Sequence, residues 1–365
     1  MNRRKKSILL GLILCMSCLI LYGCSKEKKE IKEAVYQELE QLKSSDTQTI
    51  ANCIDTQKLL PSSQDYQDIG GEMAEIFTLF YKDFTYKVKK VDIQDETHAQ
   101  AKIQLQLIDA HALAKDYSLA VLKKHIQQQA DPENSEFSLH DSCELLKKVM
   151  KDNSYSLKEE TVVLSLEKEG ESWQVIHTPE LDSLLTGDFA LYLTDARLLS
   201  PSEIVAAHLD TIRDLDQNQL MIYLSLDQLG EEDSIYGEAL ASALAGQIHQ
   251  FFDYEILEEQ TEDSQAAVKV LATTVDFESI LEAYKEQLSQ WLKENASQSL
   301  SEGAQGRRQK EQELLLSCIQ HNQKTVSKEI TIELVNDGIN WKIQMDSSLA
   351  AAVLGDITAA VNSAA

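Results

Sequence analysis

The chain contains the same pattern twice. Residues 33–54 read EAVYQELEQLKSSDTQTIANCI and align without a gap with residues 203–224, EIVAAHLDTIRDLDQNQLMIYL, at an offset of 170. Four later residues recur at an offset of 168: Gly170 as Gly338, Trp173 as Trp341, Gly187 as Gly355, and Asp188 as Asp356. A period this long is the length of a whole domain and far exceeds the repeat of a solenoid. The duplication therefore predicts two copies of one domain in tandem, each with its own core.

The first residues have the pattern of a secretion signal. The cationic segment Arg3-Arg4-Lys5-Lys6 precedes an apolar run of about 15 residues, Ile8–Tyr22. A helix that spans a bilayer needs ~20 apolar residues, so a permanent membrane span is the weaker interpretation. The leader instead predicts export.

The apolar run ends in Leu21-Tyr22-Gly23-Cys24, which resembles the lipobox of bacterial lipoproteins, although Tyr22 stands where a small residue is usual. The resemblance implies that Cys24 receives a diacylglyceryl group and that the signal peptide, residues 1–23, is then removed. Ordinary secretion and an uncleaved anchor are the alternatives. Two acyl chains anchor a protein stably. Because helix-compatible sequence follows without a Gly/Ser-rich or Pro-rich tether, the first domain is expected close to the extracytoplasmic face of the cell membrane.

The composition is strongly acidic. The whole chain has 34 Lys+Arg and 60 Asp+Glu; the leader holds four of the cationic residues and no acidic one, so the mature chain has 30 against 60 and a formal charge of −30. Phosphate binding needs clustered Lys and Arg, so nucleic acid is not expected as a partner. Solubility is the simpler reason for the charge, and recruitment of a basic partner or of cations is the alternative.

The cysteines do not form a disulfide framework. Of six cysteines, two lie in the leader and one is Cys24, which leaves Cys53, Cys143 and Cys318. These three occupy no equivalent positions in the two copies and lack the paired spacing of a zinc site. They are expected to be small buried residues.

Both copies show one order of predicted elements, α-α-β-β-α-α-β-β-α. Val35, Leu39 and Leu42 give the first helix an apolar face, and alternation predicts strands at residues 99–109 and 266–276. Because the strands come as hairpins, the sheets are expected to be antiparallel with helices on one face, an α+β fold. Further helices are predicted over residues 71–82, 136–151, 236–251 and 308–322, and further strands around 84–88, 162–166, 252–256 and 330–334.

Local signals mark where these elements begin and end. Ser200-Pro201-Ser202-Glu203 combines an N-cap serine, a proline in the first turn and a glutamate three residues after the cap, which is typical of a helix start. It begins the second copy, so the domains are set at residues 24–189 and 200–365, with a linker over 190–199. Asn336-Asp337-Gly338 predicts a hairpin turn, and residues 297–309 predict a flexible loop. The other predicted N-caps are Asp109, Thr178, Asp276 and Asp346.

The element order and the tryptophan of the closing hairpin resemble the cystatin-like, or nuclear-transport-factor-2-like, superfamily, in particular domains of unknown function in lipoproteins of Gram-positive bacteria. The resemblance implies a curved sheet and a helix that together form a cone. Enzymes of this superfamily place Asp, His or Tyr inside the cone, and Asp109, His111, Tyr117 or His98 could supply such groups. Simpler roles are favoured, because Asp109 is explained as a cap and Glu278 replaces His111 in the second copy.

Two tyrosines are the best candidates for ligand contacts. Tyr86 and Tyr254 occupy matched strand positions and carry a polar group that needs a partner when buried. Trp173 and Trp341 are expected in the core instead. The segment His140-Asp141-Ser142-Cys143 contains catalytic residue types, but neighbours on a helix do not face one another.

The sequence predicts binding and not catalysis. It contains no HExxH segment, phosphate loop, GxSxG segment or EF-hand spacing, and its histidines show no metal-ligand pairing. No enzymatic activity, cofactor or metal is expected. The chain is predicted to be a lipid-anchored lipoprotein of the cell surface that binds a protein, a wall component or a small ligand. The alternatives are a structural subunit of an envelope assembly and an enzyme with one active copy.

Overall fold

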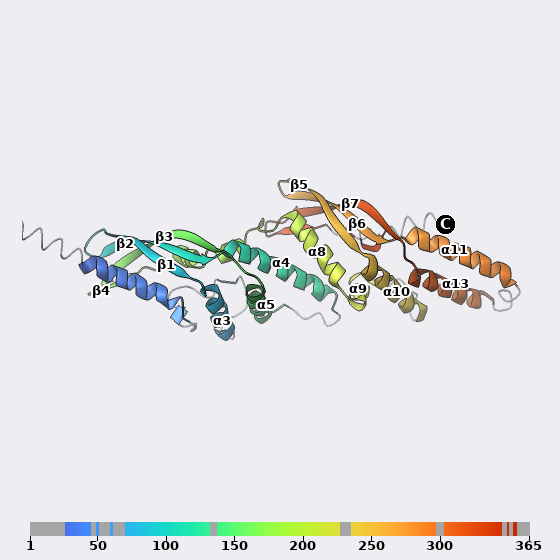
Figure 1. Ribbon diagram of the computed structural model, residues 1–365, viewed down its shortest axis with the longest axis horizontal. Helices are drawn as coiled ribbons and strands as arrows, with labels where there is room; N and C mark the ends of the chain where they lie inside the picture. The colour runs from blue at the N-terminus through green and yellow to red at the C-terminus, as the bar shows by residue number, and fades with distance from the viewer. Residues whose placement is uncertain are drawn as a thin grey trace, which may run out of the picture. The chain divides into compact units, whose positions relative to one another are not determined.

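The computed structural model describes residues 26–44, 49–50, 59–60, 70–131, 137–226, 235–296, 303–344, 349 and 353–355. Cys24, Cys53 and the predicted cap Asp346 lie outside these residues. The chain divides into two compact units, residues 1–117 with 138–194 and residues 118–137 with 195–365 (Figure 1). Residues 118–137, placed in the first copy by the sequence analysis, thus group with unit 2.

Unit 1 is built on an antiparallel sheet with the order β1-β2-β3-β4. Side chains alternate along β2, and the buried set on one face of that strand is Ala99, Ala101, Ile103, Leu105 and Leu107. This alternation is the period-two pattern read from the sequence, and it gives the sheet one apolar face. The strands are β1 (Thr85–Ile93), β2 (His98–Ile108), β3 (Leu157–Glu169) and β4 (Ser172–Val175). The helices of this part of the chain are an N-terminal helix over residues 26–41, α3 (Gly70–Phe80), α4 (Ala110–Gln129), α5 (Leu139–Asp152), α6 (Pro179–Leu185) and α7 (Phe189–Leu193). Helix α4 begins in unit 1, and its residues from 118 onward belong to unit 2.

Unit 2 repeats this plan with the sheet order β5-β6-β7-β8. Helices α8 and α10 pack on β5 and β6, and their buried side chains meet those of the sheet in one core (Figure 1). The strands are β5 (Asp253–Glu262), β6 (Gln265–Val275), β7 (Thr325–Asn336) and β8 (Trp341–Ile343). The helices are α8 (Pro201–Asp214), α9 (Gln217–Tyr223), α10 (Ile235–Phe251), α11 (Phe277–Glu294) and α13 (Gly303–Gln320).

The two sheets share an irregularity as well as an order. The register of β1 on β2 shifts between Val88 and Lys90, and that of β5 on β6 shifts between Ile256 and Glu258. Both bulges lie at the same place, since the two positions differ by 168 residues. The fold class is therefore α+β, as predicted, with mixed helices and antiparallel sheets.

The predicted helix starts inside the described residues are confirmed. The hydroxyl of Ser200 accepts a hydrogen bond from the backbone N–H of Glu203, whose carboxylate accepts one from the N–H of Ser200. Asp109 and Asp276 accept from the third residue after them, at 3.2 and 3.1 Å. Thr178 does the same for α6. Each cap satisfies an amide that the helix itself cannot pair.

One predicted loop is partly wrong. The sequence predicts flexibility for residues 303–309, but they form the first turns of α13. Gly303 begins them with a φ of +69°, which suits glycine, and the following segment is rich in Ala, Gln and Arg, which are good helix formers. Gly303 and Gly306 suggested a loop in the sequence. In the structure Gly303 begins the helix, and Gly306 lies within it.

The interior faces of both sheets are covered by side chains. In unit 1 an aromatic cluster of Phe77, Phe80, Tyr81, Phe84 and Phe189 is almost fully buried. Ring centroids in this cluster lie 5.3 to 6.3 Å apart, which is the range of favourable aromatic pairs. In unit 2 the same region is mostly aliphatic. The predicted core positions of the two hairpin tryptophans, Trp173 and Trp341, are confirmed.

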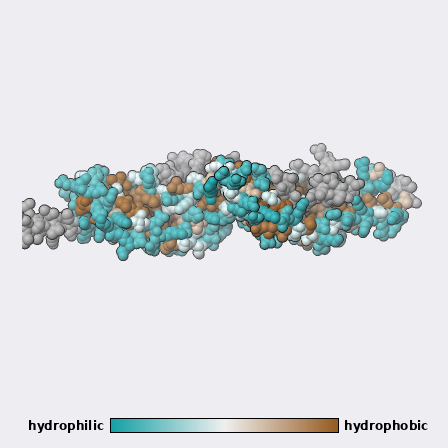
Figure 2. All heavy atoms as spheres, turned by 90° about the horizontal axis from the view of Figure 1, so that it is seen from above, coloured by the Kyte–Doolittle hydropathy of each residue, from teal (hydrophilic) through white to brown (hydrophobic). Residues whose placement is uncertain are grey.

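The face of the molecule in Figure 2 is largely hydrophilic. Hydrophobic side chains form smaller groups between the hydrophilic ones on this face. Among the described helices, none combines the length and the apolar character that crossing a bilayer requires.

Candidate functional site

The two tyrosines singled out in the sequence hold the first helix of each unit against its sheet. The Tyr86 hydroxyl donates to Glu40 Oε1 at 2.8 Å and lies 3.4 Å from the carbonyl oxygen of Tyr36. The Lys43 amine lies 5.3 Å from the Tyr86 ring centroid and 3.1 Å from the same carboxylate. A tyrosine, a carboxylate and a cation therefore form one contact set, which we call the tyrosine latch.

Unit 2 contains the same latch with different residues. The Tyr254 hydroxyl donates to Asp210 Oδ1 at 2.8 Å and lies 3.2 Å from the carbonyl oxygen of Ala206. Arg213 lies 5.6 Å from the ring centroid and 2.8 Å from the carboxylate. Burial, together with the hydrogen bond to the carboxylate, raises the pKa of both tyrosines. The latch has a structural role in both copies, and contact of either tyrosine with a ligand stays a prediction.

Tyr86→Phe tests the latch. The loss of a hydrogen bond to a carboxylate is expected to lower the free energy of unfolding by about 1–2 kcal/mol. The hydrogen bond from Tyr86 and the neighbouring Lys43 lower the pKa of Glu40 in the folded state. A lowered folded pKa gives stability that is present above the unfolded value, ~4.3, and is lost as the pH falls through the folded value. Urea denaturation at a series of pH values should show that the free energy of unfolding falls less below pH ~4 in the variant than in the unmodified protein.

Tyr36→Phe, which keeps the latch, is the control. An equal effect of both substitutions would contradict the interpretation.

A cleft of about 290 Å³ opens in unit 1 where β2 ends and α4 begins. Asp109 lines it, with one carboxylate oxygen 3.2 Å from the amine of Lys158. The rings of His111 and Tyr192 meet edge to face, with centroids 4.9 Å apart and an interplanar angle of 85°. The lining residues are Leu107, Ile108, Asp109, Ala110, His111, Lys158, Glu160, Gly187 and Tyr192.

The charges around the cleft are mainly negative. Burial acts to raise the pKa of Asp109, but the hydrogen bond from the Ala112 N–H and the contact with Lys158 lower it overall. Burial raises the pKa of Tyr192, and the negative charges of Asp188 and Glu160 raise it further. Because Lys158 is already paired with Asp109, the cleft favours a cationic group or a hydrogen-bond donor.

The equivalent place in unit 2 is built differently. A Cβ added to Gly187 would lie 3.1 Å from the methyl group of Ala110. Two small residues therefore border the cleft at this point. At an offset of 168, Gly355 faces the ring of Phe277, which would lie 3.2 Å from an added Cβ. The lining polar residues also differ, because Glu278, Val326 and Lys328 stand for His111, Lys158 and Glu160. Among the described residues, the cleft with this polar lining lies in unit 1.

The structure brings together only part of the catalytic set considered from the sequence. Asp109 and His111 both line the cleft. Tyr117 is buried against Phe189 in the core, with ring centroids 6.4 Å apart. His98 lies at the turn between β1 and β2, where its ring contacts Asp95 at 3.0 Å. The sequence analysis did not name Lys158, Glu160 and Tyr192, which are 47 or more residues from His111 and carry no local signal.

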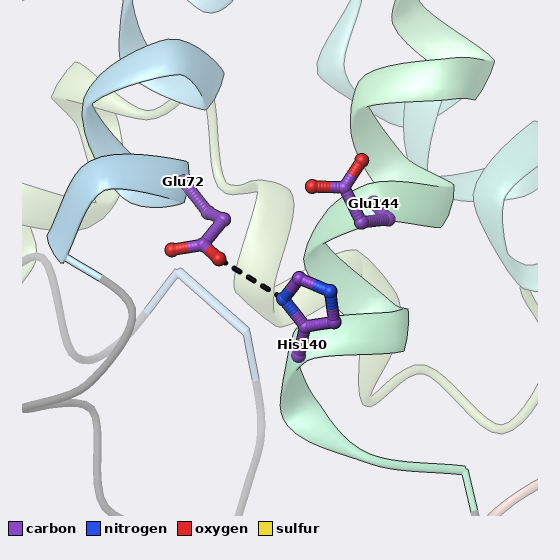
Figure 3. A group of neighbouring side chains, drawn as sticks. All are labelled: Glu72, His140 and Glu144. Atoms are coloured by element: carbon purple, nitrogen blue, oxygen red, sulfur yellow. Dashed lines mark hydrogen bonds and ion pairs between the residues drawn. The ribbon is translucent and has the colours of Figure 1, made fainter.

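A second group of polar side chains lies between α3 and α5. Figure 3 shows Glu72 of α3 directed toward His140 of α5, with Glu144 one turn further along the same helix. His140 Nδ1 and Glu72 Oε1 are 2.9 Å apart. One potential ligand atom from each of the three residues lies within 4.8 Å of the others. Among the described residues, this is the group of His, Cys, Asp and Glu side chains with the geometry to hold a metal ion.

The comparisons with known proteins add one distant likeness. The crystal structure of ycdA from Bacillus subtilis, a lipoprotein by name, aligns with a TM-score of 0.26 and 12% sequence identity, over 74% of this chain and 95% of that one. No protein-family model and no curated protein matches the chain. At this TM-score the likeness defines neither the fold nor the function.

Proposed function

We propose that the chain is an extracytoplasmic lipoprotein, anchored to the cell membrane through lipid on Cys24, whose tandem cystatin-like units serve binding and not catalysis. The leader and the lipobox-like segment support the anchor. The repeated sheet order and the repeated tyrosine latch support the duplication. The polar cleft of unit 1 is the binding site, and its ligand is a small molecule with a cationic or hydrogen-bond-donating group.

The observation that supports the proposed binding site is the difference between Ala110 in unit 1 and Phe277 in unit 2. Both begin the helix that follows the second strand of a sheet, and both face a glycine in the left-handed conformation. The small residue borders the cleft in unit 1, whereas in unit 2 the matching glycine lies beside the larger ring of Phe277. The small side chain and the polar lining of unit 1 support a ligand at this place.

The chemistry of the cleft favours binding over catalysis. A general base works best with a pKa near the operating pH. The pKa of Asp109 is lowered, and its carboxylate is engaged by a backbone N–H and by Lys158. It is therefore a weak base with a structural role. We propose no cofactor for this cleft. A protein or wall component remains the other partner class, and nucleic acid is disfavoured by the formal charge of −26.

A ligand panel tests this proposal. The full-length protein in detergent is titrated by calorimetry with small amines, glucosamine and putrescine, and with the neutral counterparts glucose and butanediol. An amine is expected to bind, and Glu160→Gln and Tyr192→Ala are each expected to weaken binding about 10-fold or more, which corresponds to 1.4 kcal/mol. Glu278→Gln, at the position in unit 2 that matches His111, is the control. Equal binding of the neutral compounds, or full binding by both cleft variants, would contradict the proposal.

A further inference from the structure

We propose that Glu72, His140 and Glu144 bind one divalent transition-metal ion of the zinc type, which bridges α3 and α5 of unit 1. This site lies on other elements than the polar cleft, and it does not depend on the lipid anchor. Figure 3 shows the three side chains that would supply the ligands.

The ligands have the spacing that a metal clamp needs. His140 and Glu144 are four residues apart on α5, so they lie one above the other on one helix face. Glu72 faces them from the first turn of α3. Ligands around a tetrahedral Zn²⁺ lie about 3.3 Å apart, given metal–ligand bonds of about 2.0–2.2 Å. The atoms already lie within 4.8 Å of one another, so small rotations of exposed side chains complete the site.

The donor types select the class of metal. One imidazole nitrogen with two carboxylates suits Zn²⁺ and other divalent transition metals better than Ca²⁺ or Mg²⁺, which prefer oxygen ligands throughout. Three protein ligands leave a position for water or for a further ligand. The His140 side chain is 60% exposed, which leaves the metal access from solvent.

Two charged features lie beside the three proposed ligands. Glu72 lies in the first turn of α3, at the positive end of the helix dipole, which favours a carboxylate there. Lys147 is buried to 7% exposure and its amine contacts Glu75 and Glu144. Glu75 therefore remains as a partner for this amine when Glu144 turns toward a metal.

The fold does not require this cluster. Helices α10 and α13 pack together in unit 2 as α3 and α5 do in unit 1. At the same offset of 168 they carry Leu240, Arg308 and Gln312 in place of the three ligands. The helix pair is therefore held by its apolar side chains, and a purely structural role does not explain a histidine between two glutamates.

Zinc titration of the full-length protein in detergent tests the site. Calorimetry with Zn²⁺ alone is expected to give one equivalent bound. His140→Ala and Glu144→Gln are each expected to weaken binding by more than ~10-fold, since even loss of a group that only supports a metal ligand costs about 10–100-fold. Electron paramagnetic resonance of bound Cu²⁺ should show nitrogen hyperfine coupling that His140→Ala removes.

Two control variants distinguish a specific metal site from general attraction of cations by the acidic surface. His98→Ala removes another exposed histidine that is paired with a carboxylate, and Asp152→Asn removes an exposed carboxylate of the same helix, α5, that contacts Lys148. Neither should change the affinity for Zn²⁺ by more than about two-fold, and circular dichroism checks that every variant is folded. Zn²⁺ binding that survives both His140→Ala and Glu144→Gln, or that His98→Ala weakens equally, would overturn the proposal. Failure of the amine titration would leave it untouched.

Discussion

Replacement of Cys24 by alanine is expected to release the protein from the membrane completely. The sulfur of Cys24 is the atom that would carry the lipid. Cells that express the variant and are fed an alkyne fatty acid should show no label on this protein, whereas the unmodified chain should be labelled and found in the membrane fraction.

Cys18→Ala is the matched control, because Cys18 lies in the leader six residues before Cys24. It should leave both the label and the membrane fraction unchanged. If Cys24→Ala remains in the membrane, the leader acts as an uncleaved anchor. If the unmodified chain is secreted without label, ordinary secretion is correct. Either result would remove the anchor from the proposed function.

Replacement of Phe189 by alanine is expected to destabilise unit 1 by about 3–5 kcal/mol. The ring is fully buried, and its centroid lies 6.3 Å from that of Phe80 and 6.4 Å from that of Tyr117. Its removal leaves a cavity in the aromatic cluster that the surrounding rings cannot fill. Hydrogen exchange should show protection lost in β2 and α3.

Leu191→Ala is the control for this variant, because Leu191 lies on the same short helix, α7, and is 60% exposed. It should change stability by less than about 0.5 kcal/mol. The same exchange data also test the predicted division of the chain. Loss of protection in β6 as large as in β2 would show that the two parts of the chain unfold together and would count against independent domains.

Much of the fold could be predicted from the sequence because the patterns that specify its helices and strands are local. The alternation of 99–109 predicted β2, since a strand places successive side chains on opposite faces. The segment from Ser200 to Glu203 predicted the start of α8, because a capping box needs only four consecutive residues. The error at residues 303–309 arose where glycine was read as a loop former and good helix formers followed it.

The candidate sites were harder to predict from the sequence because their residues are far apart along the chain. Tyr86 was singled out correctly as a residue that needs a polar partner, but its partner Glu40 is 46 residues away. Asp109 and His111 were named, yet the cleft also depends on Lys158 and Tyr192. These contacts depend on how the helices and strands pack.

The sequence alone predicted the α+β class and the helix caps, which the structure confirms, because each depends on an alternation or a spacing of a few residues. The export leader and the duplication of a whole domain stay predictions from the sequence. Only the tertiary structure decided that Glu72 faces His140 across 68 residues of chain, and that Gly187 lies beside the small Ala110 whereas Gly355 lies beside Phe277. The physical reason is that a side chain's direction follows from its own element, whereas its neighbours follow from the packing of all the elements together.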